Sequence, residues 1–390
     1  MSSLQWTNSG STRGGLKLDA TLLILVAAIV LLGLVMVGSA SINMSSKETG
    51  QPFGYLEKQL TLVLIGCVGA ACVFMVPIAR LEKLAFPLVI FAGAMLLLVF
   101  IPGLGMRING ARRWLRMPGF SFQVSELARV MTLVYIAWYC VRFEDDLRRG
   151  AGAFWRGLGL LAVVALLLLA EPDFGAATVL MVTGFLLLFL AGARLRWVLL
   201  ALGLGVLSMS AIVLASGYRM RRLKTFLDPW ADPLKDGFQL TQSLIAIGRG
   251  QWLGVGLGAS VQKLFYLPEA HNDFLFAVLA EELGLAGVVL TIGLFLALAW
   301  RVLLLSRRAY NAGLKFHSYL AAGFGIWLAV QAFVNMGVNM GVLPTKGLTL
   351  PLMSYGRSSL IVTLCWIGLI LRVHHEVATG GRSPARERYA

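Results

Sequence analysis

The chain has 390 residues, of which 58% are hydrophobic and 14% are charged. A soluble domain is nearer half apolar and a quarter charged, so this composition indicates a polytopic membrane protein without a soluble domain. The net charge of +15 would suggest nucleic acid in a soluble protein. Here cytoplasmic loops explain much of it, and no nucleic-acid partner is expected. The four cysteines lie in or beside apolar stretches without metal-binding spacing, so we interpret them as small core residues.

Apolar stretches along the chain predict an all-α membrane domain of ten transmembrane helices over 18–375. Polar tails at 1–17 and 376–390 flank it. The first apolar run has about 20 residues, longer than the apolar part of a cleaved signal peptide, so we expect a retained helix. The spans are expected at 18–40, 56–77, 84–104, 122–141, 157–171, 174–191, 194–216, 272–305, 316–341 and 356–372. The span at 272–305 is too long for one crossing and should extend past the bilayer.

Lys and Arg residues predict the orientation of these spans. An even number of spans places both termini on one side, and the tails and short loops of that side carry more than twice as many Lys and Arg residues as the short loops opposite. Because such residues concentrate in cytoplasmic loops, both termini are expected in the cytoplasm. The large loop 217–271, between spans 7 and 8, is then extracytoplasmic. The other loops expected on that outer face are 41–55, 105–121, 172–173 and 342–355.

The outer loop at 105–121 is unusually basic for its side of the membrane. Its arginines are Arg107, Arg112, Arg113 and Arg116. Arginine binds phosphate bidentately, so this loop is a candidate site for a lipid-linked phosphate. The alternative is general anchoring to anionic headgroups, with Trp114 at the interface.

Charged pairs follow in the next two segments. Glu126 and Arg129 are three residues apart and share a helix face, so they are either functional or a structural ion pair, and in both cases should face protein. Glu171 and Asp173 lie in a tight turn between two spans. They could be catalytic or metal-binding, although helix capping by Asp173 is the favoured interpretation.

The long loop 217–271 has three recognisable parts. Residues 218–224, which include Arg219, form a basic segment that emerges from the membrane. Residues 238–248 have the pattern of an amphipathic interfacial helix. The glycine-rich stretch 250–258 could allow the backbone to approach a ligand, although as a phosphate cradle the pattern is weak.

The most distinctive stretch is a polar segment with Glu269, His271 and Asp273, directly before an apolar helix. Burial raises the pKa of a carboxylate and a helix N-terminus lowers it, so Asp273 is a reasonable general base. The alternative is that Asp273 or Asn272 caps the helix. Glu281 lies about 12 Å further along the helix and fits a buried structural carboxylate better than a second catalyst.

The segment 342–359 precedes the last span and is expected to be irregular. The residues that forbid a regular helix are Pro344, Gly347, Pro351 and Gly356. Irregular backbone at membrane depth is tolerated only when it is buried or lines a cavity, so Lys346 and Arg357 are expected beside a cavity. Asn335 and Asn339, one turn apart in the preceding helix, could satisfy its backbone groups.

Long motifs in this chain resemble the SEDS family (shape, elongation, division, sporulation) over about 18–375. They are Asn109-Gly-Ala-Arg-Arg-Trp-Leu, Gln123-Val-Ser-Glu-Leu-Ala-Arg, Glu171-Pro-Asp-Phe-Gly, Gly237-Phe-Gln-Leu-Thr-Gln-Ser, Leu267-Pro-Glu-Ala-His-Asn-Asp-Phe and Pro344-Thr-Lys-Gly-Leu-Thr-Leu-Pro-Leu-Met-Ser-Tyr-Gly. The division branch is favoured over the elongation branch by Gln239-Leu-Thr-Gln-Ser, Ser260-Val-Gln-Lys-Leu and the Pro344 motif.

The resemblance implies a peptidoglycan glycosyltransferase that polymerises lipid II at the outer face of the bacterial inner membrane, at the division septum. It implies a class B penicillin-binding protein, FtsI, as partner, with FtsQ, FtsL, FtsB and FtsN as regulators. It places the catalytic carboxylate at Asp273. The candidate substrate-binding residues are Arg107, Arg112, Arg113, Glu126, Arg129, Arg219, His271, Lys346 and Ser354. The leaving undecaprenyl pyrophosphate needs positive charge, from Arg or Lys or from a divalent cation (Mg or Mn), and no organic cofactor is expected.

The chain departs from the family pattern at a few positions. Asn272 replaces the usual Thr, Val124 replaces Pro, and Arg129 replaces Lys, which keeps the cation. Arg357 stands where the second Gly of Gly-Gly-Ser-Ser is usual, and it adds charge and restricts the backbone.

Two other functions fit parts of the sequence. A lipid II flippase also needs many spans and buried charges, but no internal repeat is visible and the distinctive loops lie on one face. A scaffold without activity is the third possibility, suggested only by Arg357.

Overall fold

The computed structural model describes residues 16–108, 111–117, 120–214, 217–235, 237–345 and 347–380. Its helices are α1 (Ala20–Thr49), α2 (Gly54–Phe74), α3 (Ile78–Leu98), α4 (Val124–Arg142), α5 (Glu144–Arg149), α6 (Gly152–Ala170), α7 (Phe174–Leu190), α8 (Leu195–Leu214), α9 (Gly217–Leu227), α10 (Phe238–Gly250), α11 (Leu275–Asn311), α12 (Lys315–Asn339) and α13 (Arg357–Ala378). Its strands are β1 (Gly105–Ile108), β2 (Ala111–Met117) and β3 (Phe120–Gln123).

Each of the ten predicted spans falls on one helix. Within the described residues, eight helices are long and apolar enough to cross a membrane, namely α1, α2, α3, α4, α6, α11, α12 and α13. The other two, α7 and the Leu195–Ser208 part of α8, are shorter apolar helices. The helix over the short span predicted at 157–171 begins earlier, at Gly152, and α1 continues past its predicted end to Thr49.

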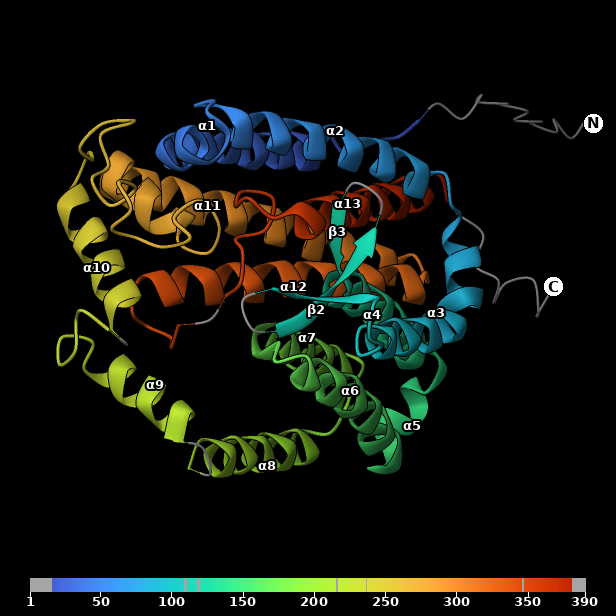
Figure 1. Cartoon of the computed structure of the whole chain (residues 1–390). Helices are drawn as coiled ribbons and strands as arrows, with labels where there is room; N and C mark the ends of the chain where they lie inside the picture. Colours follow the sequence, from blue (N-terminus) through green and yellow to red (C-terminus); the bar gives the residue numbers. More distant parts are fainter. Residues whose placement is uncertain are drawn as a thin grey trace, which may run out of the picture.

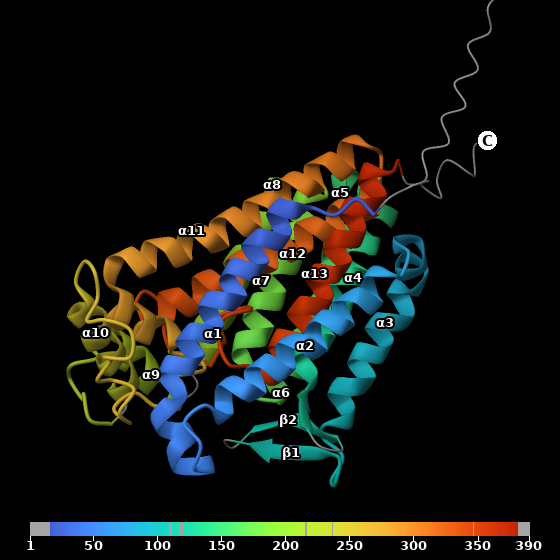
Figure 2. The ribbon, with the colours of Figure 1, turned by 90° about the horizontal axis from the view of Figure 1, so that it is seen from above.

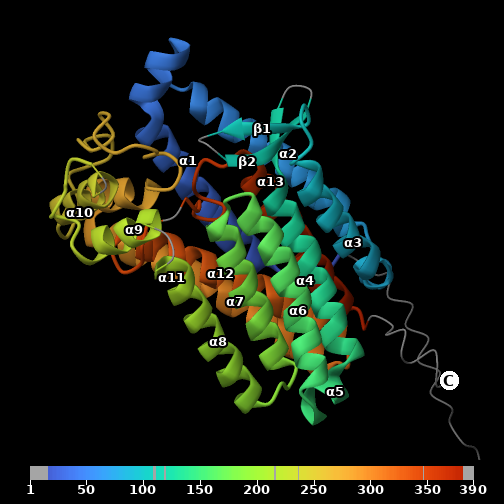
Figure 3. The same cartoon turned by 60° about the horizontal axis from the view of Figure 1, so that its bottom comes forward.

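The bundle is built around α12, which packs against α4, α7, α11 and α13 (Figure 1). Aromatic rings fill its contact with α13, where Trp327 and Trp366 have centroids 5.1 Å apart. Glycines let α2 and α13 approach closely, because a Cβ at Gly368 would lie only 2.3 Å from the carbonyl oxygen of Ala70. In contrast, α8 and α9 lie at the periphery (Figure 3).

The segment 105–123 is a three-stranded antiparallel sheet, so the expectation of an all-α fold is wrong here. Strand β2 pairs with both neighbours, and Trp114 lies opposite Met106 on β1 and Gln123 on β3. The sheet lies at one end of the bundle (Figure 2). The dipeptides Asn-Gly and Pro-Gly between the strands are common in hairpin turns. This turn signal was present in the sequence, but the segment was interpreted only by its arginines.

The long helix α11 is broken at Gly284, where φ is 64°. The groups freed at the break pair with the glycine-rich stretch 250–258. Four hydrogen bonds join them: Val255 N to Glu281 O (3.0 Å), Gly256 N to Glu282 O (3.1 Å), Leu285 N to Gln251 O (2.8 Å) and Ala286 N to Trp252 O (3.1 Å). A Cβ at Gly254 would lie 2.1 Å from Glu282 O. These glycines therefore approach the backbone of α11, and the structure gives this stretch a packing role in place of the ligand contact considered above.

The two glutamates before this break are structural, as predicted for Glu281. Glu281 is fully buried and accepts a hydrogen bond of 2.5 Å from the Ser260 hydroxyl. Glu282 is equally buried and pairs with Lys263 at 2.8 Å and with the Ser39 hydroxyl at 2.7 Å. Because a buried charge needs partners, these contacts hold the loop against α1 and α11. In the same loop, residues 217–227 form α9, and α10 confirms the helix predicted at 238–248.

Candidate functional site

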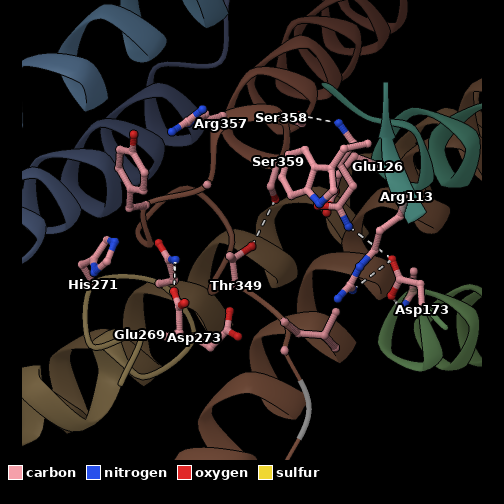
Figure 4. A pocket seen from close by; sticks show the side chains of 18 of the residues that line it. Arg113, Glu126, Asp173, Glu269, His271, Asp273, Thr349, Arg357, Ser358 and Ser359 are labelled. Atoms are coloured by element: carbon pink, nitrogen blue, oxygen red, sulfur yellow. Dashed lines mark hydrogen bonds and ion pairs between the residues drawn. The ribbon is translucent and has the colours of Figure 1, made fainter. Parts of the chain in front are cut away.

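A polar cavity of about 490 Å³ opens at the end of the bundle near the sheet. Its size is within the usual range for ligand pockets. Segments from distant parts of the chain line it (Figure 4): the C-terminal part of α1, strands β2 and β3, the first turns of α2, α4, α7 and α13, the α6–α7 turn, and the segments before α11 and α13. The polar and aromatic side chains of its wall include Tyr55, Arg113, Trp114, Glu126, Arg129, Asp173, Glu269, His271, Asp273, Thr349, Tyr355, Arg357, Ser358 and Ser359.

Asp273 lines this pocket and does not cap α11. The residue at the N-cap is Phe274, without a side-chain cap, so the capping alternative for Asn272 and Asp273 is wrong. The carbonyl oxygen of Asp273 accepts hydrogen bonds from the side-chain amides of Asn335 (2.9 Å) and Asn339 (3.0 Å). Among the described residues, none donates a hydrogen bond to its carboxylate. The backbone is therefore held while the carboxylate is free to meet a ligand.

Asn335 also binds the irregular segment, as predicted, whereas the side chain of Asn339 binds the segment around Asp273 and the start of α11 instead. Asn335 also donates to the carbonyl oxygen of Leu348 at 2.6 Å. Asn339 accepts from the backbone N–H of Ala277 at 3.1 Å, in the first turn of α11. The two segments that line the pocket are thus joined through α12, which satisfies their otherwise unpaired backbone groups.

The surroundings of Asp273 and His271 shift the pKa values of both side chains. Burial raises the pKa of Asp273 to about 7, and the negative charge of Glu269 raises it further, while Arg113 opposes the shift. Burial lowers the pKa of His271, so its imidazole is neutral at neutral pH. The rings of Tyr55 and Tyr355 pack against His271, with centroid distances of 4.8 and 5.5 Å. A carboxylate with a pKa near 7 is well matched to general base catalysis.

Gly347 leaves the space that the Asp273 carboxylate occupies. A Cβ at this position would lie 3.0 Å from the nearer carboxylate oxygen. We therefore expect Gly347→Ala to displace that carboxylate and to lower activity by about 10-fold or more, because small misplacements of a catalytic group are costly. The measurement is the turnover of purified protein beside its melting temperature. Full activity at an unchanged melting temperature would contradict this role of Gly347.

Arg113 and Asp173 form the opposite wall (Figure 4). One carboxylate oxygen of Asp173 caps α7 by accepting from Ala176 N at 3.0 Å, which confirms the predicted cap. The other accepts from the Ser125 hydroxyl at 2.8 Å and lies 3.9 Å from the Arg113 guanidinium. Asp173 is therefore both the predicted cap and a positioning residue for Arg113, a second role that was not predicted from the sequence.

Glu126 and Arg129 form a buried ion pair beneath this wall. Only 1% of Arg129 is exposed, which confirms that the pair faces protein. Arg129 also donates to the side-chain oxygen of Gln331 on α12 at 3.0 Å and to the carbonyl oxygen of Ser125 at 3.3 Å. The pair links α4 to α12 at the floor of the pocket.

Other predicted site residues lie elsewhere. Arg112 is exposed and does not line the pocket. Ser354 is buried behind it, where its hydroxyl accepts from Leu350 N at 3.0 Å, so its role is to support the loop. The side chains of Arg107 and Arg219, and the whole of Lys346, lie outside the described residues.

A divalent cation remains a prediction without support in the side chains present. Across the part of the chain that the structure describes, no group of three or more His, Cys, Asp or Glu residues could hold a metal ion. We therefore derive no step through a metal. Four residues that line the pocket were not among the site residues predicted from the sequence, namely Tyr55, Glu269, Thr349 and Tyr355. No sequence pattern marked Tyr55 as a site residue, because it lies at the start of α2, far in the chain from the other polar residues of the pocket.

Apolar helices around a pocket with carboxylates and arginines at one end define an integral membrane protein with a polar site at the end of its bundle. Residues 19–379 match the FtsW/RodA/SpoVE family profile, described as "Cell cycle protein". The chain therefore belongs to this family, which is the SEDS family.

Relatives and solved structures agree with this assignment. The chain is 52% identical over 365 residues to the probable peptidoglycan glycosyltransferase FtsW of Thioalkalivibrio sulfidiphilus, covering 94% of this chain and 91% of the relative. It is 53% identical to the protein of the same name from Nitrosococcus halophilus, covering 93% and 94%.

Two solved structures share the fold. One, from work on the coordination of polymerization and crosslinking by a peptidoglycan synthase complex, is similar with a TM-score of 0.76 and 35% identity, covering 93% of this chain and 99% of that one. The other is the rod shape determining protein RodA of Thermus thermophilus, with a TM-score of 0.65 and 31% identity, covering 93% and 98%.

Proposed function

We propose that this protein is an inverting peptidoglycan glycosyltransferase that polymerises lipid II into β-1,4 glycan strands during septal wall synthesis. The observation that carries the proposal is the Asp273 carboxylate, which stands without a partner among the described residues in a polar pocket while its backbone is fixed by Asn335 and Asn339. Relatives named peptidoglycan glycosyltransferase support the reaction class.

The reaction is a single displacement at the anomeric carbon of the growing glycan. Asp273 takes the proton from the 4-hydroxyl of the acceptor sugar, and that oxygen forms the new bond. The bond to undecaprenyl pyrophosphate breaks, and the leaving group departs with the electron pair, so the configuration inverts. Arg113, placed by Asp173, stabilises the negative charge that develops on the leaving group.

Ten helices cross the bacterial inner membrane, both termini are cytoplasmic, and the pocket opens at the outer face. The charge asymmetry of the loops supports this orientation. A class B penicillin-binding protein, FtsI, binds this chain, and FtsQ, FtsL, FtsB and FtsN regulate it. The similarity to a structure from a peptidoglycan synthase complex supports such a partner.

The test is polymerisation of fluorescent lipid II by purified protein co-expressed with its class B partner, with the products resolved on a gel. Glycan strands from the wild type support the proposal. Lipid II that crosses a vesicle membrane without any strand would overturn it in favour of a flippase. The clustering of the polar groups in one pocket favours the polymerase.

The proposed base predicts a pH dependence. Because Asp273 must be ionised to accept a proton and its pKa is about 7, kcat/KM should fall with decreasing pH below about 7 and level off above it. Glu269→Gln removes a negative neighbour that raises this pKa, so the midpoint should move to lower pH. The measurement is kcat/KM for lipid II between pH 5 and pH 9. A midpoint that stays in place or moves upward in Glu269→Gln would contradict the assignment.

A further inference from the structure

Arg357 is a pocket residue that the mechanism above does not use. It occupies the position where the SEDS pattern has a second glycine, and it is the first residue of α13. Its side chain is exposed and lines the pocket. Figure 4 shows it on a different wall from Arg113 and Asp173.

The charges of the pocket leave Arg357 without a counter-ion. The charged lining residues are the carboxylates Glu126, Asp173, Glu269 and Asp273 and the guanidinium groups Arg113, Arg129 and Arg357. Arg129 pairs with Glu126, and Arg113 lies 3.9 Å from Asp173. Among the residues that the structure describes, none forms an ion pair or a hydrogen bond with the Arg357 side chain. A free guanidinium in a pocket is suited to an anionic ligand, above all a phosphate that it can bind bidentately.

The residues next to Arg357 in the chain also line the pocket and carry further donors. The first-turn N–H groups of α13 have no acceptor within the helix, and Gly356 at the N-cap supplies no side-chain cap. Such a helix end attracts anions. Independently, Tyr355 lines the pocket, and its hydroxyl has no hydrogen-bond partner among the described residues, although only 6% of the residue is exposed. A buried hydroxyl without a partner is costly, so this donor is available to a ligand in the pocket.

We infer that Arg357, the first turn of α13 and the Tyr355 hydroxyl form a subsite for the pyrophosphate of a polyprenyl-linked substrate. The inference rests on the proposed function, in which both substrates carry such a group. Arg113 and Arg357 then serve one pyrophosphate each, on the two sides of the base. The positive charge of Arg357 offsets the repulsion between an approaching anion and the carboxylates of Glu269 and Asp273. Arg357 is then a substrate-binding residue of this chain, and its presence does not indicate a scaffold without enzymatic activity.

Binding of a short analogue tests the subsite without requiring catalysis. We expect the purified protein in detergent to bind farnesyl pyrophosphate more tightly than farnesol. Arg357→Gly restores the residue usual for the family, so the fold should tolerate it. It should weaken farnesyl pyrophosphate binding by about 10-fold or more, because a charge-assisted hydrogen bond is lost, and leave farnesol unaffected. Tyr355→Phe removes only the hydroxyl and should weaken pyrophosphate binding less. The matched control is Arg307→Gln, an exposed arginine near the end of α11.

The outcomes separate the subsite from the reaction. Unchanged farnesyl pyrophosphate affinity in Arg357→Gly, or an equal loss for farnesol, would overturn the subsite. An Arg357-dependent affinity for phosphatidylglycerol in nanodiscs as strong as that for farnesyl pyrophosphate would also overturn it, in favour of a bilayer headgroup site. In the polymerisation assay we expect Arg357→Gly to raise KM with little change in kcat. Arg357-dependent pyrophosphate binding in a wild type that makes no strands would retain the subsite and reject the polymerase.

Discussion

Replacing Asp273 with alanine or asparagine will lower lipid II polymerisation by about 10³-fold, within the range that general base catalysis contributes. The substitution removes the only proposed proton acceptor for the 4-hydroxyl. The measurement is the rate of strand formation by purified variant and wild type, each with the class B partner. Asp228→Asn is the matched control, because this exposed carboxylate lies beyond α9 and does not line the pocket.

The same variants should fold and bind the partner normally. The carboxylate has no hydrogen-bond donor among the described residues, and Asn335 and Asn339 bind only the backbone of residue 273. The pKa of Asp273 is about 7, above its ordinary value of 3.8, so ionisation of this group opposes folding once the pH exceeds about 4. At pH 8 the melting temperature of Asp273→Asn should therefore equal or exceed that of the wild type. Strand formation near the wild-type rate would show that Asp273 is not the general base. A variant that fails to fold would show that the Asp273 carboxylate has a structural role.

Arg129→Met should reduce the free energy of unfolding by about 3–5 kcal/mol, because it leaves the buried carboxylate of Glu126 without its partner. It also removes the hydrogen bond to Gln331 that joins α4 to α12. Denaturation of the purified protein in detergent, followed by intrinsic fluorescence, measures the effect.

A second variant distinguishes the unpaired charge from lost packing. The double substitution Glu126→Gln with Arg129→Met removes both charges, so it should be less destabilised than Arg129→Met alone. Arg249→Met serves as a contrasting single substitution, because Arg249 is half exposed and lies 3.5 Å from Glu281, which keeps its other hydrogen bonds. If the double variant is less stable than Arg129→Met, the charge of Glu126 is not the cause.

The helices and the main polar motifs could be predicted from the sequence because they depend on local properties. A run of apolar residues long enough to cross a bilayer must form a helix to satisfy its own backbone, so each predicted span coincides with a helix. Asp273 could be singled out from the sequence because a carboxylate at the edge of an apolar run is costly. The pairing of Asn335 with the irregular segment followed from the need of that backbone for donors.

Contacts between segments that are far apart in the chain could not be predicted from the sequence. The break of α11 at Gly284 depends on hydrogen bonds to residues 251–256, and the strand pairing at 105–123 also depends on partners outside each strand. Tyr55 and His271 are far apart in the chain, yet their ring centroids lie 4.8 Å apart.

By itself the sequence determined the mainly helical class, the positions of the long apolar helices and the polar stretch that holds Asp273, because hydropathy and the need to satisfy backbone hydrogen bonds act along the chain. The tertiary structure alone decided which charges share a pocket. Arg113 meets Asp173, Arg129 meets Glu126, and Arg357 is left without a counter-ion among the described residues. The physical reason is that Coulomb interactions act over a few ångströms in space, between residues whose separation in sequence says nothing of their distance.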